Sequence, residues 1–235
     1  MRYKSLIKKL RLNQSDFDAI KECVANAEAK TTGEIALALA PESAHYSFWE
    51  LLAGNIVSVL VLIALIPFSG RIQEMYGRLY WQNAPAWILP LFFIITCFAT
   101  ATIVFYLCNI PAIDRLIIPP AVKRNCVTHR AMRYFTESGV YETAEQSGIL
   151  IFVSYMERQV RIIADRGISA KISQDMWNLI ADELAENIKK GDVRQAFCAA
   201  VEKCGALLAE NFPPHESNPN ELADGLVIVE DSEWF

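Results

Sequence analysis

The sequence is poor in the residues and motifs that mark many well-known enzyme classes. It has three histidines and no P-loop, GxGxxG or HExxH motif and no Ser-His-Asp order. The nucleotide-binding, zincin-type and triad-type sites that these motifs mark are therefore excluded. Its six cysteines form no CxxC pair, and two of them lie in a long apolar run. We expect isolated thiols, not a disulfide framework or a zinc site.

Two further features are missing. No basic stripe with interleaved aromatic residues is present, so we expect no nucleic-acid partner. Residues 1–47 are mixed and polar, without an early apolar core or a small-residue cleavage site. We therefore expect the first long apolar run to direct membrane insertion itself. The basic end of the chain either touches anionic lipid headgroups or is simply solvated, and it comprises Arg2, Lys4, Lys8, Lys9 and Arg11.

Long apolar runs are what the sequence has in abundance. The chain of 235 residues is 53% hydrophobic, with a net charge of −5. The excess is concentrated in residues 48–68, with one charge at Glu50, and in residues 87–110, with none. A bilayer core needs about 20 apolar helical residues, so both runs predict transmembrane helices joined by a short loop. The alternative is a pair of buried core helices.

Strand-like segments lie on both sides of this predicted hairpin. Two crossings return the chain to the side that it left, so these segments can meet. A single strand leaves backbone groups unpaired, and residues 33–40 therefore need partners. We predict that they lie beside the apolar run 147–154, and that residues 159–165 close an antiparallel hairpin with it. Residues 225–229 form either a short edge strand or part of a floppy acidic tail.

Amphipathic helical patterns surround these strands. The first covers residues 13–30, with Ser15 as candidate N-cap, and the second covers residues 122–138 and ends at Gly139. The third runs from Ser173 to Gly191, and the fourth is capped by Asp192 and ends at Pro213. We predict an α/β fold, a small α/β/α sandwich with a mixed sheet and an inserted two-helix transmembrane hairpin. The expected parts are 1–45, the hairpin 46–113, 114–214, and an acidic C-terminal tail at 215–235.

Several segments, in this order, resemble the TPM-domain family. They are TGEIALALAPES, AMRYF, SGILIFVSYMERQVRIIADRGI, a Trp-bearing helix, and IKKGDVRQAFCAAVEKCGALLAENFPP. The chain is similar to the branch in which a membrane hairpin interrupts the domain after its first strand. The resemblance implies an α/β/α sandwich that works beside membrane complexes. Relatives include a thylakoid-lumen protein linked to photosystem II repair and an auxiliary protein of acetylcholine receptors, and acid phosphatase activity and calcium binding are attributed to some.

The chain departs from the family pattern where relatives carry a cation ligand. Many relatives have Asn-Asp before the Gly of the central strand, and that Asp is a natural oxygen ligand for calcium. Residues 145–148 are Glu-Gln-Ser-Gly here, and the Gly-Tyr-Gly that often follows the third strand is replaced by Asp165-Arg166-Gly167. We therefore expect no resident metal or other cofactor, and weak or absent calcium binding. Glu145 and Asp165 are the candidate ligands that remain.

Candidate functional residues lie near the predicted strand ends. Asp165 ends one strand and Glu34 begins another. If these strands are adjacent, Asp165, Glu145 and Asp175 could converge on a cation or polarise a water. The alternative is structural, because Asp165 can pair with Arg166 and Asp175 can favour a helix N-terminus through the dipole.

Two more features carry open alternatives. His129, with arginines nearby on the same predicted helix, could serve phosphoryl transfer, or it could lie on a polar face near lipid headgroups. The loop 139–148, which contains Glu142 and Glu145, is rich in acidic and hydroxyl side chains. Such a loop either binds a ligand or is a solvated connector.

These observations predict a two-pass membrane protein with a non-catalytic interaction or assembly role beside another membrane protein or complex. The alternative is a membrane-tethered, phosphatase-like hydrolase that uses carboxylates near Asp165, and a third possibility is a structural subunit whose spans do the binding. The connecting loop carries Arg71 and Arg78, whereas six basic residues flank the spans on the domain side: Lys30, Arg115, Lys123, Arg124, Arg130 and Arg133. The positive-inside rule then places both termini and the domain in the cytoplasm, at a bacterial inner or plasma membrane.

Overall fold

The computed structural model describes residues 3–80, 85–108, 110–143, 145–214, 221–222 and 224–229. The chain forms two compact units. Met1–Ala44 and Ala121–Phe235 make up the first, called here the sheet unit, and His45–Pro120 make up the second, called the hairpin unit. Most of the expected acidic tail, including His215, lies outside the described residues.

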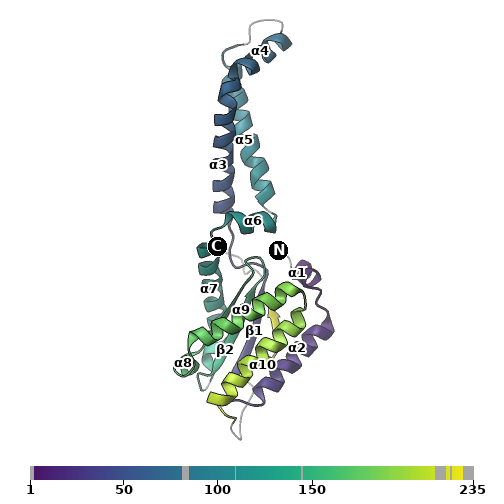
Figure 1. Cartoon of the computed structure of the whole chain (residues 1–235), viewed down its shortest axis with the longest axis vertical. Helices are drawn as coiled ribbons and strands as arrows, with labels where there is room; N and C mark the ends of the chain where they lie inside the picture. The colour runs from purple at the N-terminus through teal and green to yellow at the C-terminus, as the bar shows by residue number, and fades with distance from the viewer. Residues whose placement is uncertain are drawn as a thin grey trace. The chain divides into compact units, whose positions relative to one another are not determined.

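The sheet unit is built on a four-stranded mixed sheet with the order β3-β2-β1-β4 (Figure 1). Strand β1 (Glu34–Ala40) is parallel to β2 (Gly148–Ser154), with Glu34 opposite Gly148 and Ala40 opposite Ser154. Strand β3 (Gln159–Ala164) is antiparallel to β2, and β4 (Leu226–Ile228) is a short parallel neighbour of β1. The predicted pairing of residues 33–40 with residues 147–154 is confirmed. Of the two alternatives for residues 225–229, the structure shows the short edge strand, at Leu226–Ile228.

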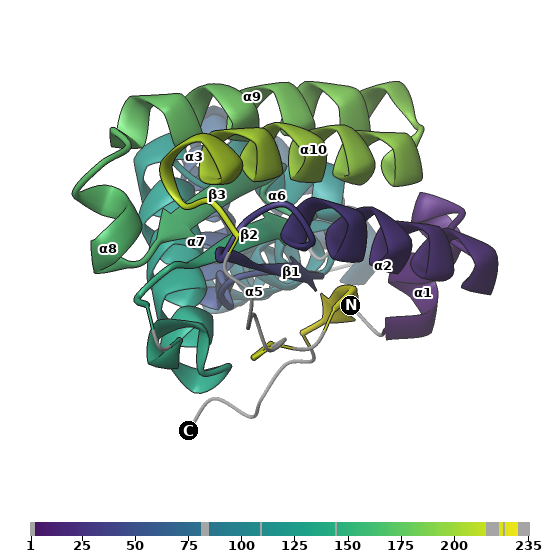
Figure 2. The same ribbon diagram turned by 90° about the horizontal axis from the view of Figure 1, so that it is seen from below.

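Helices cover both faces of this sheet, as Figure 2 shows. One face packs against α1 (Tyr3–Leu10), α2 (Gln14–Glu28), α9 (Gln174–Lys190) and α10 (Val193–Asn211), and the other packs against α7 (Pro120–Glu137). Because side chains alternate along a strand, Ile151 lies in the first core and Phe152 in the second. The α/β character and the mixed sheet of the prediction are confirmed.

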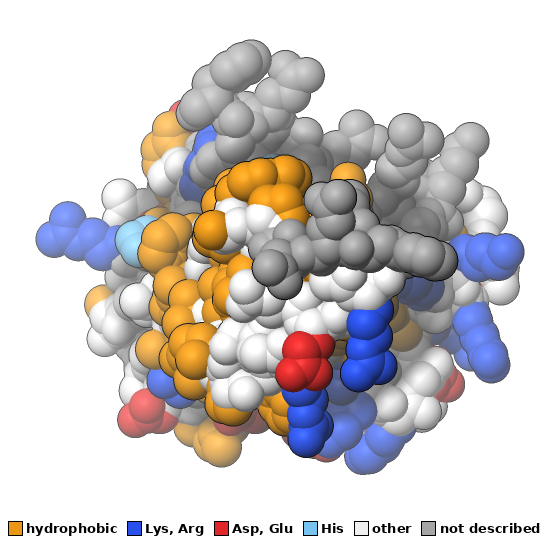
Figure 3. All heavy atoms as spheres, turned by 90° about the horizontal axis from the view of Figure 1, so that it is seen from above, with side chains coloured by type: hydrophobic (Ala, Val, Ile, Leu, Met, Phe, Trp, Pro, Cys, Tyr) orange, Lys and Arg blue, Asp and Glu red, His pale blue; other side chains and the backbone are white. Residues whose placement is uncertain are grey.

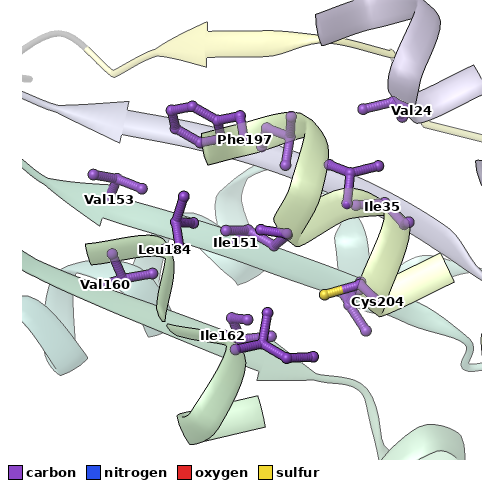
Figure 4. Packing of buried hydrophobic residues seen from close by; sticks show 14 of the residues in the cluster. Val24, Ile35, Ile151, Val153, Val160, Ile162, Leu184, Phe197 and Cys204 are labelled. Atoms are coloured by element: carbon purple, nitrogen blue, oxygen red, sulfur yellow. The ribbon is translucent and has the colours of Figure 1, made fainter. Parts of the chain in front are cut away.

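The larger core joins the helices α1, α2, α9 and α10 to the centre of the sheet. Figure 4 shows Ile151 and Val153 of β2 and Val160 and Ile162 of β3 facing side chains from the helices, among them Val24, Leu184, Phe197 and Cys204. Phe197 and Cys204 are fully buried. Burial raises the pKa of the Cys204 thiol to about 12, so this cysteine is a packing residue and not a nucleophile.

The helix ends follow the predicted signals, with two exceptions. Gly139 and Gly191 adopt left-handed conformations after α7 and α9, and Asp192 caps α10 by accepting from the Gln195 N–H. The predicted N-cap at Ser15 is wrong, because Asn13 caps α2 in a capping box with Asp16. Ser173 occupies the N-cap position of α9 but makes no side-chain cap hydrogen bond.

The expectation of isolated thiols is also wrong for one pair of cysteines. Cys23 of α2 and Cys198 of α10 form a disulfide across a sequence separation of 175 residues. Both residues lie on the contact between two adjacent helices, which a spacing rule along the chain does not detect. Cys97, Cys108, Cys126 and Cys204 are free thiols.

The hairpin unit contains α3 (Ser47–Leu65), η1 (Ile66–Phe68), α4 (Ser69–Tyr80), α5 (Ile88–Cys108) and α6 (Pro111–Ile117). Ser47–Arg78 and Ile88–Cys108 are long and apolar enough to cross a membrane. The predicted connecting loop is largely helical instead, because η1 and α4 continue the first span as far as Tyr80.

Small residues let α3 and α5 approach each other closely. A Cβ added at Gly54 would lie 3.2 Å from the Ala101 carbonyl oxygen, and the Ser58 Oγ donates to the Cys97 carbonyl at 3.1 Å. This spacing of two small residues four apart is a common device at helix contacts in membranes. Large apolar side chains point away from the contact, and Figure 3 shows how hydrophobic side chains gather on the face seen from above.

Candidate functional site

Two of the predicted site residues, Glu34 and Asp165, lie at the sheet edge where β1 and β2 begin and β3 ends, called here the carboxylate edge. The Asp165 N–H donates to the Gly148 carbonyl at 2.9 Å, and Gly148 stands opposite Glu34. Asp165, Gly148 and Glu34 thus form one row across three strands. Neighbouring strands lie about 4.8 Å apart, so the backbones of Glu34 and Asp165 are separated by roughly 10 Å.

Glu28 and Glu34 are the buried carboxyl groups of this edge. Glu28, the last residue of α2, is 8% exposed, and its Oε1 accepts from the Ile35 N–H at 2.8 Å. Burial, together with the nearby Glu34 and Asp224 carboxylates, raises the Glu28 pKa to about 8 against the lowering effect of the Ile35 N–H, so Glu28 holds a proton at neutral pH.

Glu34 differs from Glu28 in its partners. It is 3% exposed, and its Oε2 accepts from the Leu222 N–H at 3.3 Å. Burial raises the Glu34 pKa, with a smaller contribution from the Glu221 and Asp224 carboxylates, while the backbone donors oppose the rise. A protonated carboxyl beside a second perturbed carboxyl is an arrangement that can donate and accept protons.

Our sequence reasoning named Glu34 and missed Glu28. The available signal was the helical spacing of α2, in which Ile20, Val24 and Ala27 form the buried face. Glu28 follows Val24 by four residues and therefore lies on the same face. A carboxylate at such a position is buried, and a buried carboxylate has a raised pKa.

The loop between α7 and β2 packs directly against the carboxylate edge. A Cβ added at Gly148 would lie 2.3 Å from the Val140 carbonyl oxygen, and one added at Gly167 would lie 2.6 Å from that of Gln146. Ser147 donates from its N–H to the Thr143 Oγ1 at 3.1 Å and from its Oγ to the Thr32 carbonyl at 2.9 Å. Val140, Thr143 and Ser147 of this loop are therefore packed against the sheet, while its acidic side chains stay exposed.

The other predicted residues have separate environments. Asp165 caps the short helix α8 (Arg166–Ser169), with its Oδ1 accepting from the Arg166 N–H at 2.6 Å. Its Oδ2 is buried and has no hydrogen-bond partner among the residues that the structure describes. Glu142 accepts from the Tyr141 hydroxyl at 2.7 Å, and Glu142, Glu145, His129 and Asp175 are exposed.

These residues do not converge as the sequence suggested. Across the described ranges of the chain, no group of three or more His, Cys, Asp or Glu side chains is placed to hold a metal ion. Asp175 lies in the first turn of α9, where a carboxylate is favoured by the helix dipole. The structure brings together Glu28, Glu34 and Asp224, and it leaves Asp175 and His129 apart from them.

Comparison with known proteins identifies the domain type. Residues 115–207 match the family model of the TPM domain. The NMR structure of the BA42 protein from the psychrophilic bacterium Bizionia argentinensis is similar, with a TM-score of 0.54, 19% identity, and coverage of 93% of this chain and 95% of that chain. At this identity the likeness shows the fold alone. No curated protein matches the chain.

Proposed function

Because the chain carries a TPM domain, with two long apolar helices before the matched residues, we propose that it is a two-pass membrane protein whose domain is a non-catalytic interaction or assembly factor. The partner in this proposal is another membrane protein or complex. The bilayer is the second partner, through the hairpin unit.

One observation carries the proposal: the apolar side chains that α3 and α5 leave uncovered. The side chains more than 40% exposed on these two helices include Phe48, Leu51, Ile56, Leu60, Ile63, Leu91, Ile94, Phe98, Ile103 and Tyr106. So large an apolar surface needs lipid or an apolar protein face around it. Lipid contact and helix contact with a partner both satisfy that need.

The carboxylate edge supports a non-catalytic role as well. Glu28, Glu34 and Asp165 each accept a hydrogen bond from a backbone N–H, at Ile35, Leu222 and Arg166. An acceptor that satisfies a backbone donor stabilises the fold. These three carboxyl groups therefore have a structural task without any substrate.

Chain length limits what the domain can reach. Residues 41–46 alone connect β1 to α3. Seven Cα–Cα steps span at most about 25 Å. A domain on so short a connection suits a partner in or on the membrane better than a diffusing substrate.

We place the domain in the cytoplasm on the count of basic residues that flank the spans. The Cys23–Cys198 disulfide favours an oxidising compartment instead, so the orientation needs a direct measurement. A C-terminal alkaline phosphatase fusion in a bacterial host should be inactive. An active fusion would place the domain on the exported side.

Site-specific photo-crosslinking in native membranes tests the interaction role. A photoreactive amino acid at Leu60 or Phe98 probes the exposed faces of the two long helices, and one at Leu179 of α9, which is 65% exposed, probes the domain. We expect at least one of these positions to capture a discrete membrane protein that survives detergent washing. Adducts at all three positions that are no more abundant than those of an unrelated two-pass protein would contradict the proposal.

A specific observation also favours a second function, a phosphatase-like hydrolase. The buried Asp165 Oδ2 lacks a hydrogen-bond partner in the described part of the chain, and Glu28 is protonated at neutral pH, which are features of acid–base sites. Hydrolysis of a generic phosphomonoester by the wild type and by Asp165→Ala separates the two functions. Equal background rates support the interaction role, whereas turnover that the folded variant has lost supports the hydrolase.

A further inference from the structure

A cavity of the sheet unit lies at the edge opposite to the carboxylate edge. It has a volume of about 610 Å³ and opens where β1 and β2 end and β3 begins. The end of α1, the last turn of α9 and the first turn of α10 complete its wall. Four segments that are distant in sequence therefore contribute to it, and none of the carboxylates discussed above lines it.

The wall of this cavity, called here the basic pocket, is strongly cationic. Lys9, Arg11, Arg158 and Lys189 line it, and Glu186 is the carboxylate among its lining residues. Glu186 pairs with Lys189 at 3.6 Å, where both side chains are well exposed. The lining thus carries a formal charge of +3, which favours an anion.

The floor of the basic pocket is apolar. Leu39, Val153, Val160 and Phe197 line it and are at most 5% exposed. A cationic rim above an apolar floor matches a ligand that joins a phosphate to an apolar group. A simple inorganic anion would use the rim and leave the floor in contact with water.

The backbone segments that carry the cations are packed, while the charged side chains themselves are exposed. Leu6 and Leu10 of α1 are buried in the main core, so Lys9 and Arg11 belong to a docked helix and its end, and not to a solvated tail. Arg11 has a φ of 54°, in the left-handed region that a residue with a side chain rarely adopts.

The backbone of Arg158 is fixed in a similar way. Its φ is 53°, and it follows the buried Glu157 in the turn between β2 and β3. Glu157 accepts from the Ser43 N–H at 2.8 Å and from the Ser154 Oγ at 2.5 Å. This network ties the turn that carries Arg158 to the segment that leaves β1.

We propose that the basic pocket binds the phosphate of an anionic phospholipid headgroup, with the first apolar atoms of the lipid against the floor. The pocket adjoins the end of β1, and the chain continues from there through residues 41–46 into α3, the first candidate span. Access to lipid rests on the proposed membrane location. A soluble phosphate ester is the other source of the same chemistry, and the experiment separates the two.

Two matched double variants of the full-length protein in neutral detergent test the proposal. Arg158→Gln with Lys189→Gln removes two pocket charges. Lys190→Gln with Arg194→Gln removes two exposed charges that do not line the pocket. The probes are short-chain phosphatidylglycerol, short-chain phosphatidylcholine, and glycerol 3-phosphate, with binding measured by native mass spectrometry and thermophoresis, and circular dichroism confirms folding.

We expect the wild type and the control variant to bind phosphatidylglycerol in preference to phosphatidylcholine. The pocket variant should bind it about tenfold or more weakly, because charge-assisted hydrogen bonds to phosphate are lost. An equal loss of phosphatidylglycerol affinity in both variants would mean that net charge alone controls binding, and it would overturn the proposal. If glycerol 3-phosphate binds as tightly as the lipid, the ligand of the pocket is a soluble phosphate ester, and the lipid proposal is wrong. No membrane partner is needed in this assay, so its outcome is independent of the crosslinking result.

Discussion

Replacing Glu28 by Gln should change how the stability of the sheet unit depends on pH. The Gln amide oxygen keeps an acceptor for the Ile35 N–H, which lies 2.8 Å from Glu28 Oε1, and the new side chain has nearly the same volume. The substitution therefore removes the titration of Glu28 and leaves its packing and hydrogen bond. A pH-dependent difference between the two proteins then reports on this one carboxyl group.

The magnitude follows from the pKa of Glu28 in the two states. It is 4.5 in an unfolded chain and about 8 in the folded protein. Between these values the folded state binds a proton that the unfolded state has released, so the free energy of unfolding falls as the pH rises. The slope is about 1.4 kcal/mol per pH unit, and the whole interval amounts to about 3–5 kcal/mol. This stability is fully present below pH 4.5 and is lost as the pH approaches 8.

Pulse proteolysis of the full-length protein in detergent, across a urea series at several pH values between 5 and 8, measures this difference. Glu28→Gln should match the wild type near pH 5 and exceed it by several kcal/mol near pH 8. A residual slope should remain, because Glu34 also has a raised pKa. Glu22→Gln, an exposed carboxylate of the same helix, is the control and should follow the wild type. Parallel loss of stability in the wild type and in Glu28→Gln would refute the reasoning.

Three further predictions concern the rest of the molecule. Gly148→Ala should destabilise the protein by about 3 kcal/mol or more and lower its melting temperature, because the added Cβ would lie 2.3 Å from a carbonyl oxygen. Gly70→Ala is the control and should be close to neutral, because no atom lies within 4 Å of its added Cβ. Similar shifts of the melting temperature for both variants would contradict this. Cys23→Ser should abolish the mobility difference between reduced and non-reduced protein on a denaturing gel. It should also lower the free energy of unfolding by about 2–4 kcal/mol. A mobility difference that persists would point to another cysteine pair. Calcium up to the millimolar range should leave the melting temperature unchanged, since a bound ion would raise it by mass action.

The main elements of the sheet unit were predictable because their signals are local. The apolar runs of β1 and β2 indicate buried strands, and the first strand needs a pairing partner, which the sequence offers after the hairpin. Gly139, Gly191 and Asp192 mark helix ends through conformations and hydrogen bonds that involve only nearby residues. Such signals can be recognised in the sequence without any knowledge of tertiary contacts.

The site features depend on contacts between distant segments, and the sequence alone did not reveal them. The Cys23–Cys198 disulfide arises from the way that α2 docks on α10, across 175 residues of sequence. The basic pocket is a stronger case, because Lys9 and Lys189 are brought to one cavity by helices that are far apart in the chain. No spacing rule along the sequence captures such a meeting.

The pairing of β1 with β2 sets an order of events during synthesis. Gly148, the partner of Glu34, leaves the ribosome 114 residues later. At about 5–20 residues per second, β1 waits roughly 6–20 s for its neighbour. In a two-pass protein both apolar helices emerge during that interval. In the proposed two-pass protein, the sheet can therefore close only after both apolar helices have emerged, so the domain is completed after the hairpin and not before it.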